Sequence, residues 1–81
     1  MRITVKLFAV LRERAGVGEL DLELPEPASV HVAAEQIGRR LPMLRELLPR
    51  VAFAINREYV KPDARLKDGD ELALIPPVSG G

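Results

Sequence analysis

The sequence predicts an α+β domain in which one main helix packs across a mixed sheet of four or five strands. Two stretches alternate between apolar and polar residues with the period of half-buried strands, and one longer stretch has an apolar stripe at helical spacing. A strong turn motif precedes the last apolar strand. The 81 residues suffice for one domain with a modest core, which buries roughly 60% of the surface of the unfolded chain.

The first two strands are predicted at Ile3 to Phe8 and at Glu19 to Leu24, where apolar residues occupy every second position. Between them, Ala9 to Ala15 contains good helix formers and stops at Gly16, which predicts a short helical turn followed by a glycine-containing turn. Because this connection is short, we expect the two strands to pair antiparallel.

The main helix is predicted after two prolines end the second strand, with Ser29 as its N-cap. Gly38 costs this helix about 1 kcal/mol relative to alanine, so we expect close packing against the sheet at that position. The apolar stripe of the helix consists of Val30, Ala33, Ala34, Ile37 and Leu41.

A second, short helical piece is predicted at Met43 to Leu48, between Pro42, which can open it, and Pro49, which ends it. The apolar run Val51 to Ile55 follows, and turn residues come directly after it at Asn56 to Glu58. We therefore expect a hairpin or a tight strand reversal in this part of the chain.

The last strand is predicted at Glu71 to Ile75, after the turn Lys67 to Asp70, because Asp-Gly readily adopts positive φ. Pro76 and Pro77 then remove two backbone donors, so the sheet must end there. We expect residues 1–75 to form the domain and residues 76–81 a flexible, extended tail. Six extended residues reach at most about 20 Å, enough to enter the active site of a neighbouring protein.

The chain ends in Gly80 and Gly81, which have no Cβ, so the backbone and terminal carboxylate can pass through a slot that side chains would block. The free-energy cost of ordering the tail on binding is about equal to the stabilisation from burying Val78 and forming new backbone hydrogen bonds. The tail alone should therefore bind weakly. A partner would also hold the body, through exposed apolar residues such as Phe8 and Ile75. A frayed chain end without function is the alternative for a bare Gly-Gly pair.

The composition excludes several classes of function. Twelve basic and twelve acidic residues give no net charge, which argues against nucleic-acid and membrane-surface partners. The absence of cysteine excludes disulfides, thiolate metal sites and cysteine nucleophiles, and one histidine makes no metal site. The longest apolar runs are shorter than a signal peptide or a membrane helix requires, so we expect a cytoplasmic protein.

Other polar residues have simpler explanations than a site. Asp68, Asp70 and Glu71 could be a carboxylate metal cluster, but a solvated turn is favoured because calcium-loop spacing is missing. His31 lacks a catalytic partner and is expected at the surface. The acidic residues Glu19, Asp21 and Glu23 are expected on the solvent side of a strand near a sheet edge, and Gly16 and Gly18 in turns without a phosphate-binding motif.

Four segments carry a resemblance to a known family, and the last of them is the most specific. The segments are Phe8-Ala9 with Arg12-Glu13, Ala54 to Asn56, Leu66 with Asp68 to Ala73, and Pro76 to Gly81. With these segments the chain resembles, along nearly all of its length, the β-grasp sulfur carriers, the MoaD/ThiS family of ubiquitin-like proteins, and in particular the small subunits of molybdopterin synthase. The closing Pro-Pro-Val-Ser-Gly-Gly is closer to that branch than to the thiamin branch.

The resemblance implies a carrier cycle. An activating enzyme similar to the ubiquitin-activating class uses ATP and Mg²⁺ to adenylate the Gly81 carboxylate, and a persulfide donor then converts the adenylate into a thiocarboxylate. A large synthase subunit supplies the catalytic side chains that move sulfur to cyclic pyranopterin monophosphate, twice for each dithiolene. The chain itself would bind no cofactor and would join a dimer of large subunits in a heterotetramer.

The resemblance also assigns residues. Gly81 would be the covalent site, and Gly80, Ser79 and Val78 would thread into the partner. Phe8, Arg12, Ile75, Pro76 and Pro77 would contact the partner, although Arg12 could equally be a solvated charge. The alternatives are a sulfur carrier for thiamin or tRNA thiolation, a protein modifier attached to lysines, and a non-covalent interaction domain.

Overall fold

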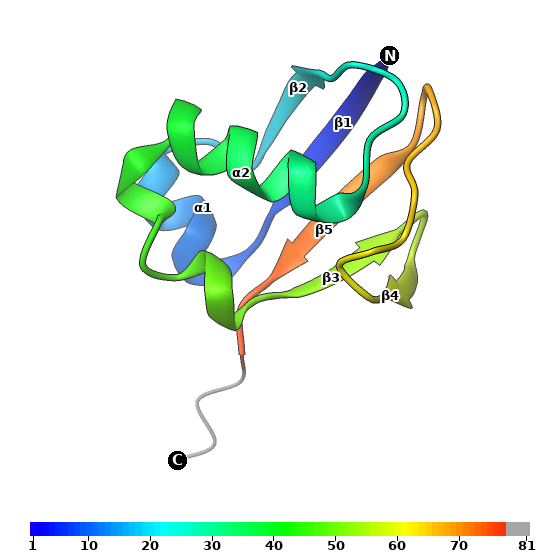
Figure 1. The fold of residues 1–81 in the computed structure, drawn as a ribbon. Coiled ribbons are helices and arrows are strands. Elements are labelled where there is room, and N and C mark those ends of the chain that lie inside the picture. The colour runs from blue at the N-terminus through cyan, green and yellow to red at the C-terminus, as the bar shows by residue number, and fades with distance from the viewer. Residues whose placement is uncertain (78–81) are drawn as a thin grey trace.

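The computed structural model of the protein describes residues 1–77 and confirms the predicted α+β class. Five strands form one mixed sheet in the order β2-β1-β5-β3-β4, and the main helix crosses one face of it (Figure 1). This is the β-grasp arrangement that the resemblance implied. The strands are β1 (Arg2–Leu7), β2 (Glu19–Glu23), β3 (Ala52–Ile55), β4 (Glu58–Val60) and β5 (Glu71–Ile75). The helices are α1 (Ala9–Ala15), α2 (Val30–Arg40) and the 3₁₀ turns η1 (Pro42–Leu44) and η2 (Leu48–Arg50).

The last strand of the chain is the middle strand of the sheet. β5 pairs parallel with β1, with Leu7 opposite Leu74, and antiparallel with β3, with Ala52 opposite Ile75. β1 and β2 pair antiparallel, as their short connection predicted. A strand held on both sides has both rows of backbone groups in hydrogen bonds, so the part of the chain that precedes the tail is firmly anchored.

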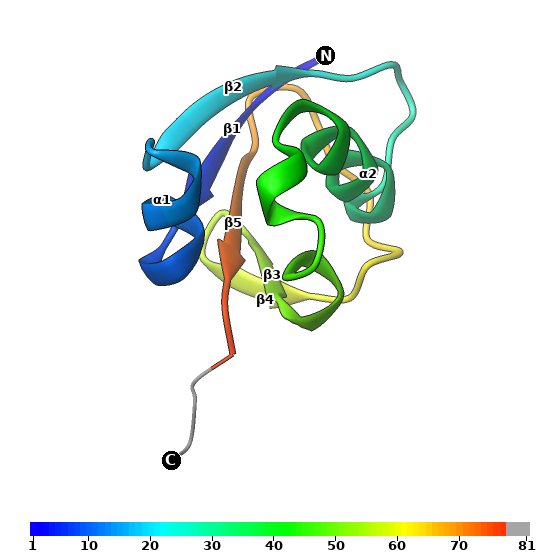
Figure 2. The same ribbon diagram turned by 90° about the vertical axis from the view of Figure 1, so that its left-hand side faces the viewer.

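The core lies between the sheet and α2, as the two views in Figures 1 and 2 show. The predicted alternation of β1 is confirmed, because Ile3, Val5 and Leu7 are at most 2% exposed. Opposite the sheet, the stripe of α2 buries Val30, Ala33 and Ile37 completely, whereas Ala34 and Leu41 are only half-buried. Leu11 brings α1 into the same core.

Local chemistry sets the ends of both helices. The Ser29 hydroxyl accepts a hydrogen bond from the Val32 backbone N–H (3.3 Å), which confirms the predicted N-cap of α2. α1 ends at Gly16, whose left-handed backbone (φ +78°) lets its N–H bond to the Arg12 carbonyl. Phe8, predicted as the last residue of the first strand, instead lies between β1 and α1 with an extended backbone.

Two predictions for the helical region are wrong. Gly38 packs against the segment after α2 and not against the sheet, because a Cβ there would lie 3.2 Å from Leu48 Cδ1 and 3.5 Å from Arg45 Cγ. The predicted helix from Met43 to Leu48 is interrupted, and its two ends belong to separate 3₁₀ turns. Pro49 does not end a helix but lies at the start of η2. The backbone N–H groups at the start of a helical turn make no hydrogen bond within it, so proline, which has no N–H, is tolerated there.

The predicted hairpin is confirmed between β3 and β4. Its two turn residues, Asn56 and Arg57, have φ values of +49° and +72°, the pattern of a type I′ turn. The Asn56 side chain also holds the turn to the start of β5. Its Nδ2 donates a hydrogen bond to Asp70 Oδ1 (3.0 Å), and its own Oδ1 accepts one from the Glu71 backbone N–H (2.9 Å). Asparagine tolerates this backbone, whereas arginine does so at a cost.

We expect Arg57→Gly to raise the free energy of unfolding by about 1 kcal/mol, because glycine adopts the left-handed backbone without strain. For a domain of this size the melting temperature should rise by several degrees, measured by thermal circular dichroism. Arg45→Gly is the matched control, because Arg45 has a right-handed backbone (φ −51°) and glycine there only adds freedom to the unfolded chain. Equal destabilisation by both changes would contradict the explanation.

Candidate functional site

The tail leaves the body from the middle of the sheet. β5 ends at Ile75, as the two prolines predicted; Pro76 is half-buried and Pro77 is exposed. On one side of β5, Ile75 pairs with Ala52 of β3. On the other side, the pairing of β5 with β1 ends one residue earlier, at Leu74 opposite Leu7. Phe8, the next residue after β1, therefore lies level with Ile75. Figure 1 shows the end of β5 directed out of the body.

An apolar surface surrounds this exit on the face of the sheet opposite α2. The strand register places Ala52 beside Ile75, and Ala54 between Ala73 and Tyr59, on that face. Phe8 continues the alternation of β1 with an extended backbone (φ −125°) and reaches the same face. We call this surface the outer-face patch: Phe8, Ala52, Ala54, Tyr59, Ala73 and Ile75.

The outer-face patch has large side chains at its margins and small ones in the middle. Phe8 is 46% and Tyr59 is 73% exposed, and both count among the large exposed apolar side chains of residues 1–77. Of the three alanines between them, Ala52 is exposed, Ala73 is half-buried and Ala54 is buried (4%). Exposed aromatic rings beside a flat apolar surface are typical of protein interfaces.

Phe8 and Ile75 were predicted from the sequence as contact residues, whereas the other residues of the patch were not. Alanines at alternate positions of β3 look like ordinary strand residues, and Tyr59 follows the predicted turn without any sign of which face it occupies. Only the pairing of β3 with β4 and β5 brings them beside Ile75. The period-two alternation was the signal available in the sequence, but without the register it does not show which face is exposed.

A charged row closes the patch on the side of β1. Lys6 lies between Glu19 (Nζ to Oε1, 3.0 Å) and Glu71 (3.8 Å). The hydrogen bond to Glu19 and the charges of both carboxylates raise the pKa of Lys6 above its usual value of 10.5. Since the folded-state pKa is the higher one, this contribution to stability is fully present at neutral pH and is lost only as the pH rises through the folded-state pKa.

The turn between β1 and α1 positions Phe8 and Arg12. Ala9 has a left-handed backbone (φ +50°), an unfavourable conformation for alanine that redirects the chain directly after Phe8. Arg12 is exposed and lies over the following turn, because a Cβ on Gly18 would be 3.1 Å from its Nε. It belongs to no ion pair that the described residues form with one another, so its guanidinium is available to a partner.

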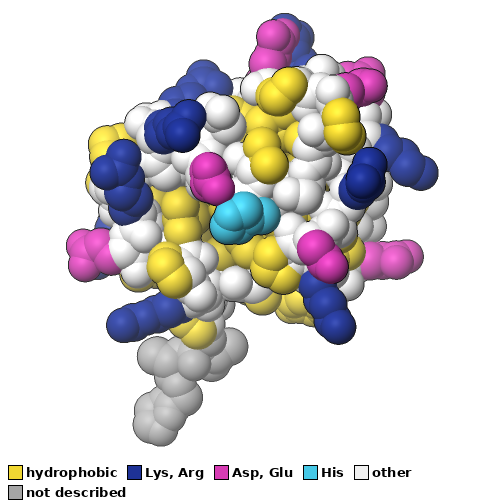
Figure 3. Space-filling model, in the orientation of Figure 1, with side chains coloured by type: hydrophobic (Ala, Val, Ile, Leu, Met, Phe, Trp, Pro, Cys, Tyr) yellow, Lys and Arg dark blue, Asp and Glu magenta, His cyan; other side chains and the backbone are white. Residues whose placement is uncertain are grey.

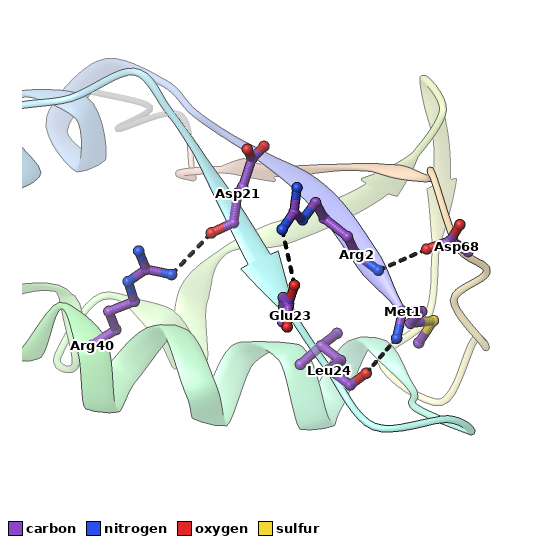
Figure 4. Close-up of polar contacts among 7 residues, drawn as sticks. All are labelled: Met1, Arg2, Asp21, Glu23, Leu24, Arg40 and Asp68. Carbon is purple, nitrogen blue, oxygen red and sulfur yellow. Dashed lines mark hydrogen bonds and ion pairs between the residues drawn. The ribbon is translucent and has the colours of Figure 1, made fainter.

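The carboxylates that could suggest a metal site instead hold turns together. The Arg2 N–H donates to Asp68 Oδ1 (2.8 Å, Figure 4), and the Lys67 N–H donates to Asp70 Oδ2 (2.8 Å). Within residues 1–77 no group of three or more acidic or histidine side chains is placed to hold a metal ion. The predicted turn is present, and the carboxylates of Asp68 and Asp70 accept hydrogen bonds from backbone N–H groups.

The remaining polar candidates are also at the surface. His31 is exposed and pairs with Glu35 on the next turn of α2 (3.0 Å). The acidic residues of β2 lie on an edge strand, as predicted, and α2 reaches this edge because Arg40 donates to the Asp21 carbonyl (2.9 Å, Figure 4).

The predicted covalent and threading residues Val78, Ser79, Gly80 and Gly81 lie outside the described residues. None of the helices within residues 1–77 has the length and apolar character needed to cross a membrane.

Comparisons with known proteins identify the family. The model of the ThiS family matches residues 5–81. A molybdopterin synthase sulfur carrier subunit from Chlamydomonas reinhardtii is 46% identical, and the match covers all of both chains. The crystal structure of SAMP1, a small archaeal modifier protein, from Haloferax volcanii has a TM-score of 0.90 at 30% identity over all of both chains.

A third relative is seen with a partner. The complex of subunits 1 and 2 of molybdopterin-converting factor from Helicobacter pylori contains a chain with a TM-score of 0.72 at 26% identity, again over all of both chains. The match to the family model covers nearly the whole sequence, and these solved structures share the fold of this chain. The chain belongs to the ThiS family.

Proposed function

We propose that this protein is a sulfur carrier for molybdenum cofactor biosynthesis, acting as the small subunit of molybdopterin synthase. The observation that carries the proposal is the exit of a Gly-Gly tail from the anchored middle strand, directly beside an exposed apolar patch. The name of the Chlamydomonas relative supports the same role. The rigid body would present the tail, while the catalytic side chains would belong to other proteins.

The proposed chemistry takes place at the Gly81 carboxylate. A carboxylate is a poor electrophile, so an activating enzyme first joins it to AMP from ATP with Mg²⁺ and releases pyrophosphate. A persulfide sulfur then displaces AMP, and cleavage of the S–S bond by a thiol of a partner protein leaves the thiocarboxylate. Because the chain has no cysteine, no thiol of its own can capture the activated carboxyl. In the cytoplasm, the large subunit would use the new sulfur nucleophile on cyclic pyranopterin monophosphate.

The outer-face patch would bind the large subunit. Burial of Phe8 and Tyr59 would supply the apolar contact that the tail alone lacks, since ordering the tail offsets most of its own binding energy. Arg12 would contribute an ionic contact, and Pro76 and Pro77 would lie along the entrance to the partner's active site. The Helicobacter complex of two subunits supports such a partner, and we extend it to a heterotetramer around a large-subunit dimer.

A second function is favoured by one specific observation, the similarity to SAMP1. A modifier protein would use the same adenylated carboxylate but transfer it to a lysine amine. Isopeptide-linked conjugates in native cells would indicate this use, whereas free chain with sulfur in place of one terminal oxygen indicates the carrier. A shared carrier for thiamin or tRNA thiolation would show the same mass but a different large partner.

Deletion of Gly81, or addition of one residue after it, should abolish sulfur loading, because the reacting carboxyl is then missing from its place. Intact mass after incubation with the activating enzyme, ATP and a persulfide donor measures the loading. The same extension at the N-terminus is the matched control and should load normally. Full sulfur transfer by the chain that lacks Gly81 would refute the proposal.

Phe8→Ala and Tyr59→Ala should each weaken binding to the large subunit, with an increase in Kd of about tenfold for Phe8→Ala. Both side chains are exposed, so the melting temperature should change little. Calorimetric titration of the large subunit measures the affinity. Val17→Ala is the control, because Val17 is a similarly exposed apolar residue (45%) outside the patch. Equal loss of affinity in all three variants would exclude the patch as the docking surface.

A further inference from the structure

A second surface, on the side of α2, is also built for contact. α2, the segment after it and the start of β3 enclose an open groove of about 550 Å³. Figure 3 shows this face, with apolar side chains exposed among basic and acidic ones and the single histidine. We call it the helix-side groove; its apolar lining is Ala34, Gly38, Leu48, Pro49, Val51 and Pro62.

In one part of the groove, a helix position without a side chain lies beside a 3₁₀ turn. Gly38 lets Leu48 approach α2 closely, and Phe53 of β3, only 8% exposed, lies beneath. Leu48 and Val51 stay half-buried and Pro49 exposed. The apolar lining is therefore only partly removed from water by the chain itself, and an occupant that covered it would gain hydrophobic energy.

The charges at the rim indicate the sign of the occupant. Arg39 and Arg45 line the groove, are exposed, and take part in no ion pair formed among residues 1–77. Residues 36–57 contain five arginines and one glutamate, in a chain whose total charge is zero. That glutamate, Glu46, lies 3.7 Å from Arg14 and so is shared with a cation outside the segment. The lining also contains one acidic residue, Glu35, which lies 3.0 Å from His31. Arg39 and Arg45 are therefore the charges of the lining that have no ion-pair partner among residues 1–77, and they leave the groove with an excess of positive charge.

The position of the groove separates it from the outer-face patch. Val51 directly precedes β3, whose first residue, Ala52, lies opposite Ile75 at the tail exit. The groove is therefore near the exit but on the side of α2, across the sheet from Phe8 and Tyr59. An occupant of the groove would not compete for the outer-face patch.

We propose that the helix-side groove binds an acidic amphipathic peptide segment of a partner protein. Its apolar side chains would cover Leu48 and Val51, and its carboxylates would meet Arg39 and Arg45. A nucleic acid fits less well, because the exposed part of the lining is mainly apolar and its one exposed aromatic ring, His31, is paired with Glu35. A second copy placed groove to groove would bring like-charged rims together. The proposal does not depend on the chemistry at Gly81.

The first test uses a synthetic helical peptide with Leu at positions i, i+3, i+4 and i+7 and Glu elsewhere. Titrated into the ¹⁵N-labelled full chain, it should shift the amide signals of Ala34, Leu48 and Val51 and leave those of Tyr59 and Ala73 in place. The same peptide with Lys in place of Glu should bind at least about tenfold more weakly. Absence of binding, or shifts centred on the outer-face patch, would overturn the proposal.

The second test reverses the rim charges. Arg39→Glu combined with Arg45→Glu should raise the Kd for the acidic peptide by at least about tenfold. Arg57→Glu combined with Lys67→Glu makes the same change of charge away from the groove and should leave the Kd nearly unchanged. Arg39→Gln with Arg45→Gln replaces the first pair if the reversed charges disturb folding, and is expected to weaken binding in the same direction.

The remaining outcomes decide between occupants. An equal effect of the rim and control variants would mean that only net charge matters and would overturn the proposal. Tighter binding of single-stranded DNA than of the acidic peptide at the same salt concentration would assign the surface to nucleic acid instead. Concentration-dependent dimerisation that the rim variants abolish, seen by sedimentation without peptide, would assign it to a second copy.

Discussion

The pairing of β5 on both of its edges is the constraint on which the rest of the structure depends. Its side chains Leu72 and Leu74 are fully buried, and its backbone is held by β1 on one side and β3 on the other. A strand in this position cannot slide or fray without breaking two ladders and opening the core. The segment that follows, beginning with Pro76 and Pro77, therefore starts from a rigid point.

The same constraint divides the surface around the tail into two different faces. Opposite α2, the alternation of β5 and β3 exposes small apolar residues, and the ends of neighbouring elements add Phe8 and Tyr59. On the side of α2, Leu48 packs closely on Gly38, and the open groove lies beside these two residues. One face is apolar with a charged border, and the other is apolar with a basic rim. Two partners could thus recognise the body by different chemistry near one tail.

Local signals predicted most of the fold because each of them acts within a few residues. The Ser29 cap, the Gly16 end of α1 and the Asp68-Gly69 turn all lie where the sequence indicated. The wrong predictions concern residues whose packing depends on residues far from them in the sequence. Gly38 was expected to pack on the sheet, and it packs on Leu48, ten positions along the chain. Pro49 was expected to end a helix, but it lies inside the 3₁₀ turn η2, in the segment that packs beside α2.

The sequence by itself determined the class of the fold, the absence of cysteine chemistry and the position of the Gly-Gly tail after the last strand. These follow from composition, from periodicity and from proline and glycine, whose effects are local. Only the tertiary structure decided which residues meet beside the tail. Phe8, Tyr59 and Ile75 are far apart in the chain, and a shift of one residue in the strand register would turn every side chain of a strand to the other face. The outer-face patch and the helix-side groove are therefore properties of strand order and packing, which no local pattern in the sequence specifies.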